Sequence, residues 1–547
     1  MAKFFNHLLL AGAALATLSC NQNAKVDDQD GLTAISKDSL SAHIKVLSSD
    51  EFKGRRPMTD GEAKTIDYLQ KTFKSMGLEA GNGDSYLQDV PLVEITPKGV
   101  TDMTIQSPKG DFKLKPMEDF VVFTKRTDTV QTLANDDIVF AGFGVVAPEY
   151  NWNDYAGLDV KGKVVIVMVN DPGFETGDTT LFKGKAMTYY GRWTYKYEEA
   201  ARQGAKACLI VHTTKAASYP FQVVQTSNGG VKLHLDKRGS NDYQLAMQGW
   251  ITHNTAIKLL QSAGKDTSAL HAANNKGFKG FDLGLKASAT LKTKPVFNKS
   301  HNVIAKITGS KRPEEYVIFT AHWDHLGVGK PDAKGDTIYN GALDNASGTA
   351  AIIEIARAFK AMKTPPERTI VFLSVTAEEQ GLLGSAYYGE KPVYPADKTV
   401  ANINIDGINF FGKTKDAGIY GSGQSELEDY LVDELKKHNR FLAPEAHPEA
   451  GLYFRSDHFS FAKIGVPSVS ISGGKQVIGK EDGYGKKISE AYTANRYHQP
   501  SDEFDATWNL DGAVEDIGLI FNIGKRLAFE TKFPQWRETS EFKKLRK

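Results

Sequence analysis

The stretch that decides the fold is YVIFTAHWDH, residues 316–325, in which an uncharged run leads directly into two histidines and an aspartate. A short run of this kind, rich in β-branched and aromatic residues, predicts a buried strand over 316–321. Similar runs predict strands at 369–375, 399–405 and 466–471, and a helix is predicted over 347–362. Alternating strands and helices predict an α/β domain with a mostly parallel central sheet flanked by helices.

Ionisable residues follow three of these predicted strands at the points where the strands end. His322 and Asp324 follow the first, Glu378 and Glu379 the second, and Asp406 the third. A single carboxylate at a strand end is usually a loop residue or a helix cap. Ligands, however, collect at the carboxyl edge of open α/β sheets, so three strands ending in this way together indicate a site.

Asp344 lies in GALDNASG, residues 341–348, directly before the predicted helix. It has two interpretations, a helix N-cap or a carboxylate that bridges two metal ions, and the turn before a helix suits both. Carboxylates and imidazoles without thiolates fit zinc and leave manganese or cobalt open. Hydrolysis also needs a base that is not a ligand. The adjacent Glu378 and Glu379 supply a metal ligand and a base, because neighbouring side chains at a strand end point in different directions.

Five motifs carry a family resemblance in their order along the chain: AHWDH (321–325), GALDNASG (341–348), AEEQGLLGS (377–385), NID (404–406) and YH (497–498). With them, the sequence resembles the co-catalytic zinc exopeptidases of peptidase family M28, which include leucyl-aminopeptidase-like and glutamate-carboxypeptidase-like enzymes. The resemblance covers about 300–547 and the helical segment 38–80. It implies the zinc-exopeptidase fold, hydrolysis of terminal peptide bonds and two zinc ions (Zn2+) per chain.

The resemblance also implies roles for single residues. Asp344 would bridge the metals, His322 and Asp406 would complete one site, and Glu379 and His498 the other. Glu378 would be the general base.

Further roles concern the surroundings of these ligands. Asp324 would orient His322, and Asp502 is either a supporting residue or a turn residue. The stretch YFRSDH, residues 453–458, which includes Asp457, resembles a family motif near the substrate. Tyr453 or Tyr497 would donate a hydrogen bond to the oxyanion, or else be a core residue.

The pattern of the sequence changes between about 131 and 295, where short runs that predict β-strands dominate. Four pieces resemble the protease-associated domain that many members carry as an insertion: VFAGFG (139–144), DYAGL (154–158), GKVV (162–165) and AARQGA (200–205). Such a domain would flank the cleft and restrict access. The predicted division is a signal peptide (1–19), a tether (20–30), the first part of the catalytic domain (31–130), the β-rich insertion (131–295) and the main catalytic part (296–547).

The N-terminal residues predict export. Lys3 precedes an apolar run, residues 8–18, which is too short to span a membrane in the usual way, and Cys20 follows. Cys20 fits lipid attachment of a bacterial cell-envelope lipoprotein, periplasm-facing or at the surface, although Thr17 departs from the usual lipobox; plain secretion is the alternative. The other cysteine, Cys208, lies in an apolar run and predicts a buried structural thiol.

The charge balance favours no charged partner. The chain has 67 Lys and Arg residues and 66 Asp and Glu residues, which gives a net charge of +1. No nucleic-acid partner is therefore predicted, and contact with a membrane is predicted only through a lipid on Cys20. The expected partners are peptide substrates, and the sequence does not define the oligomeric state. Aminopeptidase is the favoured activity. The alternatives are a carboxypeptidase that meets a free carboxylate with Arg455, a glutaminyl-cyclase-like transferase with one zinc, and an inactive receptor-like binding protein.

Overall fold

The computed structural model describes residues 29–546. The predicted signal peptide, Cys20 and most of the predicted tether lie outside the described residues. None of the helices within 29–546 is both long and apolar enough to cross a membrane.

The first lobe is built on a mostly parallel sheet, as predicted. Its strands run in the spatial order β13 (Phe281–Ile307), β17 (Arg368–Val375), β14 (Arg312–His322), β18 (Thr399–Asn404), β21 (Ser468–Gly473) and β19 (Asp416–Tyr420). The four central strands are parallel, whereas β13 and β19 pair antiparallel at the two sides. Short strands β1 (Glu79–Ala80) and β20 (Phe441–Leu442) extend the two sides.

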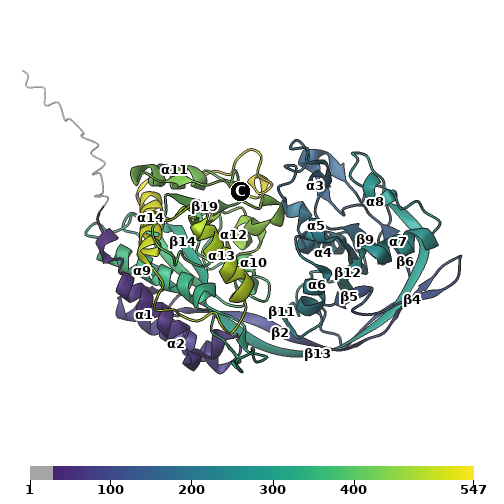
Figure 1. Ribbon diagram of the computed structural model, residues 1–547, viewed down its shortest axis with the longest axis horizontal. Coiled ribbons are helices and arrows are strands. Elements are labelled where there is room, and N and C mark those ends of the chain that lie inside the picture. The colour runs from purple at the N-terminus through teal and green to yellow at the C-terminus, as the bar shows by residue number, and fades with distance from the viewer. Residues whose placement is uncertain (1–28, 547) are drawn as a thin grey trace, which may run out of the picture.

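Helices cover both faces of this sheet because its strands alternate their apolar side chains. Val317 and Phe319 face a large core with α1 (Lys37–Leu47), α2 (Asp60–Ser75), α9 (Ser347–Ala361), α11 (Leu427–Lys437) and α14 (Asp511–Phe529). Ile318 faces the opposite side, where α10 (Leu383–Glu390) and α12 (His458–Ala462) pack. Helix α13 (Tyr484–Asn495) precedes α14 in the chain, and Figure 1 shows α1, α2, α9 and α14 grouped at the left.

A second lobe has its own parallel strands and its own cores. Strands β6 (Val130–Phe140), β9 (Val164–Met168), β10 (Ala207–His212) and β12 (Met247–Thr252) are parallel, and β5 (Phe120–Phe123) closes one side antiparallel. Its helices are α3 (Gly173–Thr176), α4 (Trp193–Arg202), α5 (Thr214–Ala217), α6 (Phe221–Asn228), α7 (His253–Ser262) and α8 (Ala269–Ala272). Cys208 is fully buried in β10, as predicted for a structural thiol.

A long two-stranded ribbon joins the lobes. Strand β2 (Leu87–Val100) pairs antiparallel with β13 from Leu87 opposite Val303 to Val100 opposite Leu291. Figure 1 shows the ribbon running beneath both lobes. Strand β11 (Lys232–Leu235) pairs with β2, and β3 (Met103–Gln106) and β4 (Phe112–Leu114) continue the sheet in the second lobe. The remaining strands form two small hairpins: β7 (Val146–Ala147) with β8 (Trp152–Asn153), and β15 (Gly327–Val328) with β16 (Ile338–Tyr339).

The elements do not break at the predicted domain boundaries. The boundary at 295/296 falls inside β13, which continues without interruption into the sheet of the first lobe. Strands β3 to β5, predicted to belong to the first catalytic part, place Met103, Leu114 and Phe120 in the core of the second lobe. The physical reason is the ribbon, because a pair of continuous strands belongs to both lobes at once. The division into domains stays a prediction.

Candidate metal centre and active site

The predicted site residues meet at the carboxyl edge of the central sheet. His322 is the last residue of β14, Asp406 lies two residues beyond β18, and Glu378 and Glu379 follow the end of β17 at Val375. These three strands are adjacent and parallel, so their ends bring the side chains together. Asp344 comes from the turn before α9, and His498 from the loop between α13 and α14.

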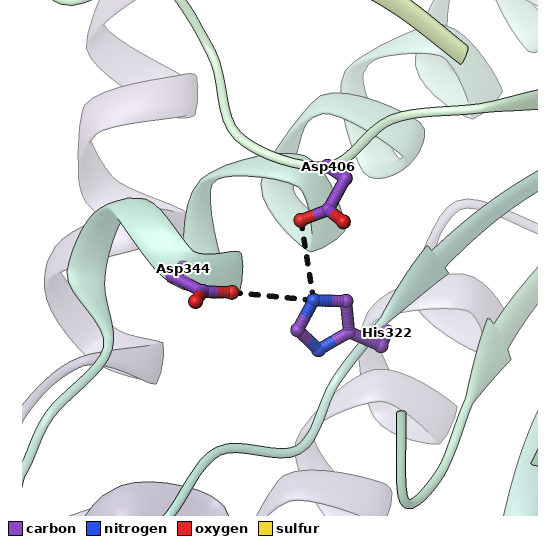
Figure 2. A group of neighbouring side chains, drawn as sticks. All are labelled: His322, Asp344 and Asp406. Carbon is purple, nitrogen blue, oxygen red and sulfur yellow. Dashed lines mark hydrogen bonds and ion pairs between the residues drawn. The ribbon is translucent and has the colours of Figure 1, made fainter. Parts of the chain in front are cut away.

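The first group joins His322, Asp344 and Asp406. The Nε2 atom of His322 lies 3.3 Å from Oδ1 of Asp344 and 3.3 Å from Oδ1 of Asp406 (Figure 2). Figure 2 shows both carboxylates facing the same ring nitrogen. The imidazole is buried, with 1% of its side chain exposed, so its orientation is fixed by packing.

The second group joins Asp344, Glu379 and His498. The Nε2 atom of His498 lies 3.2 Å from Oδ2 of Asp344 and 3.1 Å from Oε2 of Glu379. Asp344 therefore presents one oxygen to each group, Oδ1 toward His322 and Oδ2 toward His498. That placement is what a bridging carboxylate requires, and it puts Asp344 at the centre of the site.

The spacing of these atoms fits a metal centre. Two ligands of one tetrahedral zinc, each about 2.0–2.2 Å from the ion, lie about 3.3–3.5 Å apart. The four histidine–carboxylate separations are 3.1 to 3.3 Å. Charged N–H···O hydrogen bonds are shorter, about 2.7–2.9 Å. In addition, Nε2 of His498 is buried and has no hydrogen-bond partner among the described residues. The donor set therefore suits zinc.

The two adjacent glutamates have opposite electrostatic environments. Burial and the nearby charges of Asp406, Asp457 and Glu379 raise the pKa of Glu378 well above its usual value, although His322 opposes the shift. Burial and Asp344 would also raise the pKa of Glu379, but His498 and His325 outweigh them and lower it to about 2. Neighbouring carboxyls whose pKa values are pushed apart are typical of an acid–base group beside a permanently ionised one.

Glu378 also stands apart from the ligand atoms. Its Oε2 lies 3.9 Å from Nε2 of His322, farther than the spacing of any ligand pair. The residue before it, Ala377, has a φ of 53°, in the left-handed region, which turns the chain as it leaves β17. The backbone N–H of Glu378 donates to Oδ1 of Asp324 at 3.0 Å, which holds this turn in place.

Asp324 is placed differently from its predicted role. Its carboxylate oxygen lies 3.8 Å from Nδ1 of His322, whereas its backbone carbonyl lies at 3.1 Å from the same nitrogen. The backbone oxygen therefore orients His322, and the carboxylate positions Glu378 instead. Burial raises the pKa of Asp324 to about 8.

Asp502 supports the turn that carries Asp344. Its carboxylate accepts hydrogen bonds from the backbone N–H groups of Leu343 at 3.1 Å and Asp344 at 3.2 Å, and from the Tyr492 hydroxyl at 3.0 Å. Of the two interpretations of Asp502, the contacts match the supporting role.

The stretch 453–458 contributes two buried groups to the site. The Ser456 hydroxyl donates to Oδ2 of Asp406 at 2.7 Å and accepts from Nδ2 of Asn404 at 2.8 Å. Asp457 is fully buried, and burial raises its pKa to about 6, against the effect of the nearby His322. Ser456 thus fixes one ligand carboxylate, and Asp457 adds a negative charge behind His322.

The two candidate tyrosines have different surroundings. Tyr453 is buried among Phe454, His458 and Phe542, and its hydroxyl lies 3.3 Å from the carbonyl of Ser468. Of the two interpretations of Tyr453, the contacts match the core residue, because its hydroxyl is engaged inside this cluster. Tyr497 stacks on the ring of His498, with centroids 3.8 Å apart, and is 39% exposed. Only Tyr497 stands where a substrate has access.

Two residues that the structure brings to the site were not predicted. His325 lies within the quoted motif, and its Nδ1 is 2.5 Å from Oε1 of Glu379. Arg55 is fully buried and donates to four backbone carbonyls, those of Leu47, Trp323, Asn340 and Gly341. The second histidine of the motif was a signal for His325. No local pattern distinguishes Arg55 from its neighbour Arg56.

The chain is similar to known proteins over the segment that carries this site. Residues 302–520 match the model of peptidase family M28. Carboxypeptidase Q of Xenopus laevis is 23% identical over 314 residues, 57% of this chain and 55% of the relative. A probable glutamate carboxypeptidase of Arabidopsis thaliana is 24% identical over 422 residues, 74% of this chain and 55% of the relative. The chain thus spans about half the length of these curated relatives.

Two further matches name zinc or aminopeptidase. A probable zinc metalloprotease of Pyrenophora teres is 38% identical over 131 residues, 24% of either chain. Among solved structures, an aminopeptidase from Aneurinibacillus is 20% identical and covers 94% of this chain and 97% of its own, with a TM-score of 0.48. The segment that matches peptidase family M28 contains all five predicted ligands, His322, Asp344, Glu379, Asp406 and His498.

Proposed function

We propose that the protein is a two-zinc exopeptidase that hydrolyses terminal peptide bonds, with His322, Asp344, Glu379, Asp406 and His498 as ligands. The observation that carries the proposal is the position of Asp344, whose two oxygens face His322 and His498 at 3.3 and 3.2 Å. A carboxylate whose two oxygens face two different histidines is expected in a site with two metal ions and not in a site with one.

Bound zinc would supply polarisation of the scissile carbonyl and a lowered pKa for water, and the chain's own residues supply the rest. Glu378 accepts the proton from the attacking water at its carboxylate and returns it to the leaving amine. Its burial beside other carboxylates raises its pKa, which suits a group that both takes and gives a proton. Asp324 holds Glu378 through the backbone, and Ser456 holds Asp406. Tyr497 stacks on His498 and is exposed, which supports a role of its hydroxyl in contacting the substrate.

Contacts of the second lobe near the site support the proposal that this lobe restricts the access of substrates. The backbone N–H of Leu233 in β11 lies 3.5 Å from Oε1 of Gln380, the residue after Glu379. At another point the backbone N–H of Met187 donates to the Pro448 carbonyl at 3.0 Å. The proposed protease-associated lobe therefore touches the segment that carries two site residues. Contacts of this kind favour short substrates or free chain ends over folded proteins.

Aminopeptidase is the first candidate for the direction of cleavage, as the sequence favours. A second candidate, carboxypeptidase, is favoured by one specific observation. Arg455 and Arg192 lie near each other, since burial and the positive charge of Arg455 together lower the pKa of Arg192 to about 10. The Nε atom of Arg192 is buried and has no hydrogen-bond partner among the described residues. The positive charge of Arg455 also opposes the rise in the pKa of Tyr497 that burial causes, so Arg455 adds positive charge near the site. Such a charge suits a free carboxylate.

A panel of peptides blocked at one end, analysed by mass spectrometry, separates the candidates. An aminopeptidase cleaves C-blocked peptides and leaves N-blocked peptides intact; a carboxypeptidase does the reverse. Arg455→Gln serves as the matched variant, because it should raise KM for N-blocked peptides in the second case only. Cleavage of neither set, with ammonia release from N-terminal glutamine, would indicate a cyclase. An intact fold without metal or hydrolysis would indicate a receptor-like binding protein.

We also propose export with lipid attachment at Cys20, on the sequence pattern alone. The mature protein should begin at Cys20 and sediment with membranes, and Cys20→Ser should release it. A mature chain that retains Met1 would contradict export.

A further inference from the structure

His325 lies beside the second group of ligands. Its side chain is buried, and it brings a ring nitrogen within 4.8 Å of oxygens of Asp344 and Glu379. Its ring lies edge-on to that of His498, with centroids 5.7 Å apart. Two explanations are open: His325 is a further metal ligand, or it holds one of the ligands in place.

The interatomic distances distinguish these explanations. Two atoms bound to the same tetrahedral zinc lie about 3.3–3.5 Å apart. His498 meets its two carboxylates at 3.1 and 3.2 Å, close to that spacing. His325 Nδ1 is 2.5 Å from Oε1 of Glu379, closer than two ligands of one ion lie, and neither atom has a hydrogen-bond partner elsewhere among the described residues. The two histidines also use different oxygens, since His498 faces Oε2.

We infer that His325 is a positioning residue for the second metal site: its Nδ1 contacts Oε1 of Glu379 and thereby keeps Oε2 turned toward His498 and Asp344. The inference rests on the proposed function in one respect, that Glu379 is a metal ligand. Without this contact the Glu379 carboxylate is free to rotate and loses the orientation that a ligand needs. Partners that orient ligands in this way typically contribute 10–100-fold in metal affinity.

The surroundings of His325 keep the ring in place. Gly341 has a φ of 56°, and a Cβ at this position would lie 2.5 Å from Cγ of His325. The ring therefore packs directly on the backbone of the turn that carries Asp344. Consequently, the same turn sets the positions of Asp344 and of the histidine that holds Glu379.

The test uses three replacements of His325 and measures zinc affinity by competition with a chromophoric chelator. His325→Leu removes the donor and should weaken the second zinc about 10–100-fold while the first zinc stays bound. His325→Asn places its amide nitrogen where Nδ1 lies and should restore most of the affinity. His325→Gln places its amide nitrogen nearer the position of Nε2 and should resemble leucine. The comparison of Asn with Gln remains decisive if the leucine variant does not fold.

A matched control is His301→Leu. His301 forms another histidine–glutamate pair, with Nδ1 2.8 Å from Oε1 of Glu62, and its loss should leave zinc binding unchanged. A wild-type protein that binds fewer than two zinc ions refutes the proposed function itself. If the wild type binds two, equal affinity in His325→Leu overturns this inference alone. An asparagine variant as weak as leucine overturns it too, because coordination rather than hydrogen bonding would then explain the contact.

Discussion

Replacing Glu378 with glutamine tests the division of work between the two adjacent glutamates. The substitution keeps size and shape but removes the proton acceptor. Because Glu378 lies 3.9 Å from His322, outside the 3.1–3.3 Å spacing of the ligand pairs, both metal sites should survive. General acid–base groups contribute ~10²–10⁴-fold, and a group that serves two proton transfers should lie at or above the upper end. That loss corresponds to about 5 kcal/mol in the activation free energy.

Glu379→Gln should behave differently, because Glu379 faces His498 at 3.1 Å and has a pKa lowered to about 2. A neutral amide there should weaken one metal site, and added zinc should restore part of the activity. The assay pairs metal content with single-turnover rates for both variants. Glu378→Gln should keep both metals, with kcat nearly abolished and KM little changed. If instead Glu378→Gln loses metal while Glu379→Gln keeps it, the roles are reversed. A small rate effect in both would refute the site.

Other changes test the supports of the site and the stability of the fold. Ser456→Ala removes the 2.7 Å hydrogen bond to Asp406 and should weaken the zinc held with His322 about 10–100-fold in chelator competition, leaving the second zinc unaffected. Arg55→Leu leaves four buried carbonyls without their donor and should cost about 3–5 kcal/mol in urea unfolding, whereas a change under about 1 kcal/mol would contradict its role. Burial lowers the pKa of His458 to about 3. As the pH falls below 6.5, His458 is therefore protonated in the unfolded chain before it is protonated in the folded chain. The fold should therefore lose about 2 kcal/mol from this group by pH 5, and His458→Gln should show a smaller loss over that range.

Much of the site could be predicted because parallel strands impose it. His322, Glu379 and Asp406 end three strands that pair directly, so their spacing along the chain translates into one edge of a sheet. Asp344 could be placed only as one of two alternatives, since a turn before a helix suits a cap as well as a bridge. His498 comes from a loop far along the chain, and only the family resemblance pointed to it.

Other features could not be read from local pattern. In the ribbon of β2 and β13, a single strand belongs to both lobes. A change in the composition of the sequence cannot locate a domain boundary within such a continuous strand. The sequence left two interpretations of Tyr453 open, because the contact of its hydroxyl with Ser468 depends on tertiary packing. The carboxylate of Asp324 holds Glu378 rather than His322 because the backbone carbonyl of the same residue occupies the closer position. Such choices between two atoms of one residue are settled only by the fold.

Metal content tests the central claim most directly. Elemental analysis of the purified protein, of its chelator-treated form and of Asp344→Asn measures whether one carboxylate serves two ions. The account predicts two zinc ions per chain, reversible loss of activity on chelation, and weakened binding of both ions in Asp344→Asn, because Oδ1 faces His322 and Oδ2 faces His498. One tightly bound zinc with full activity, or an Asp344→Asn variant that keeps both ions at wild-type affinity, would contradict it.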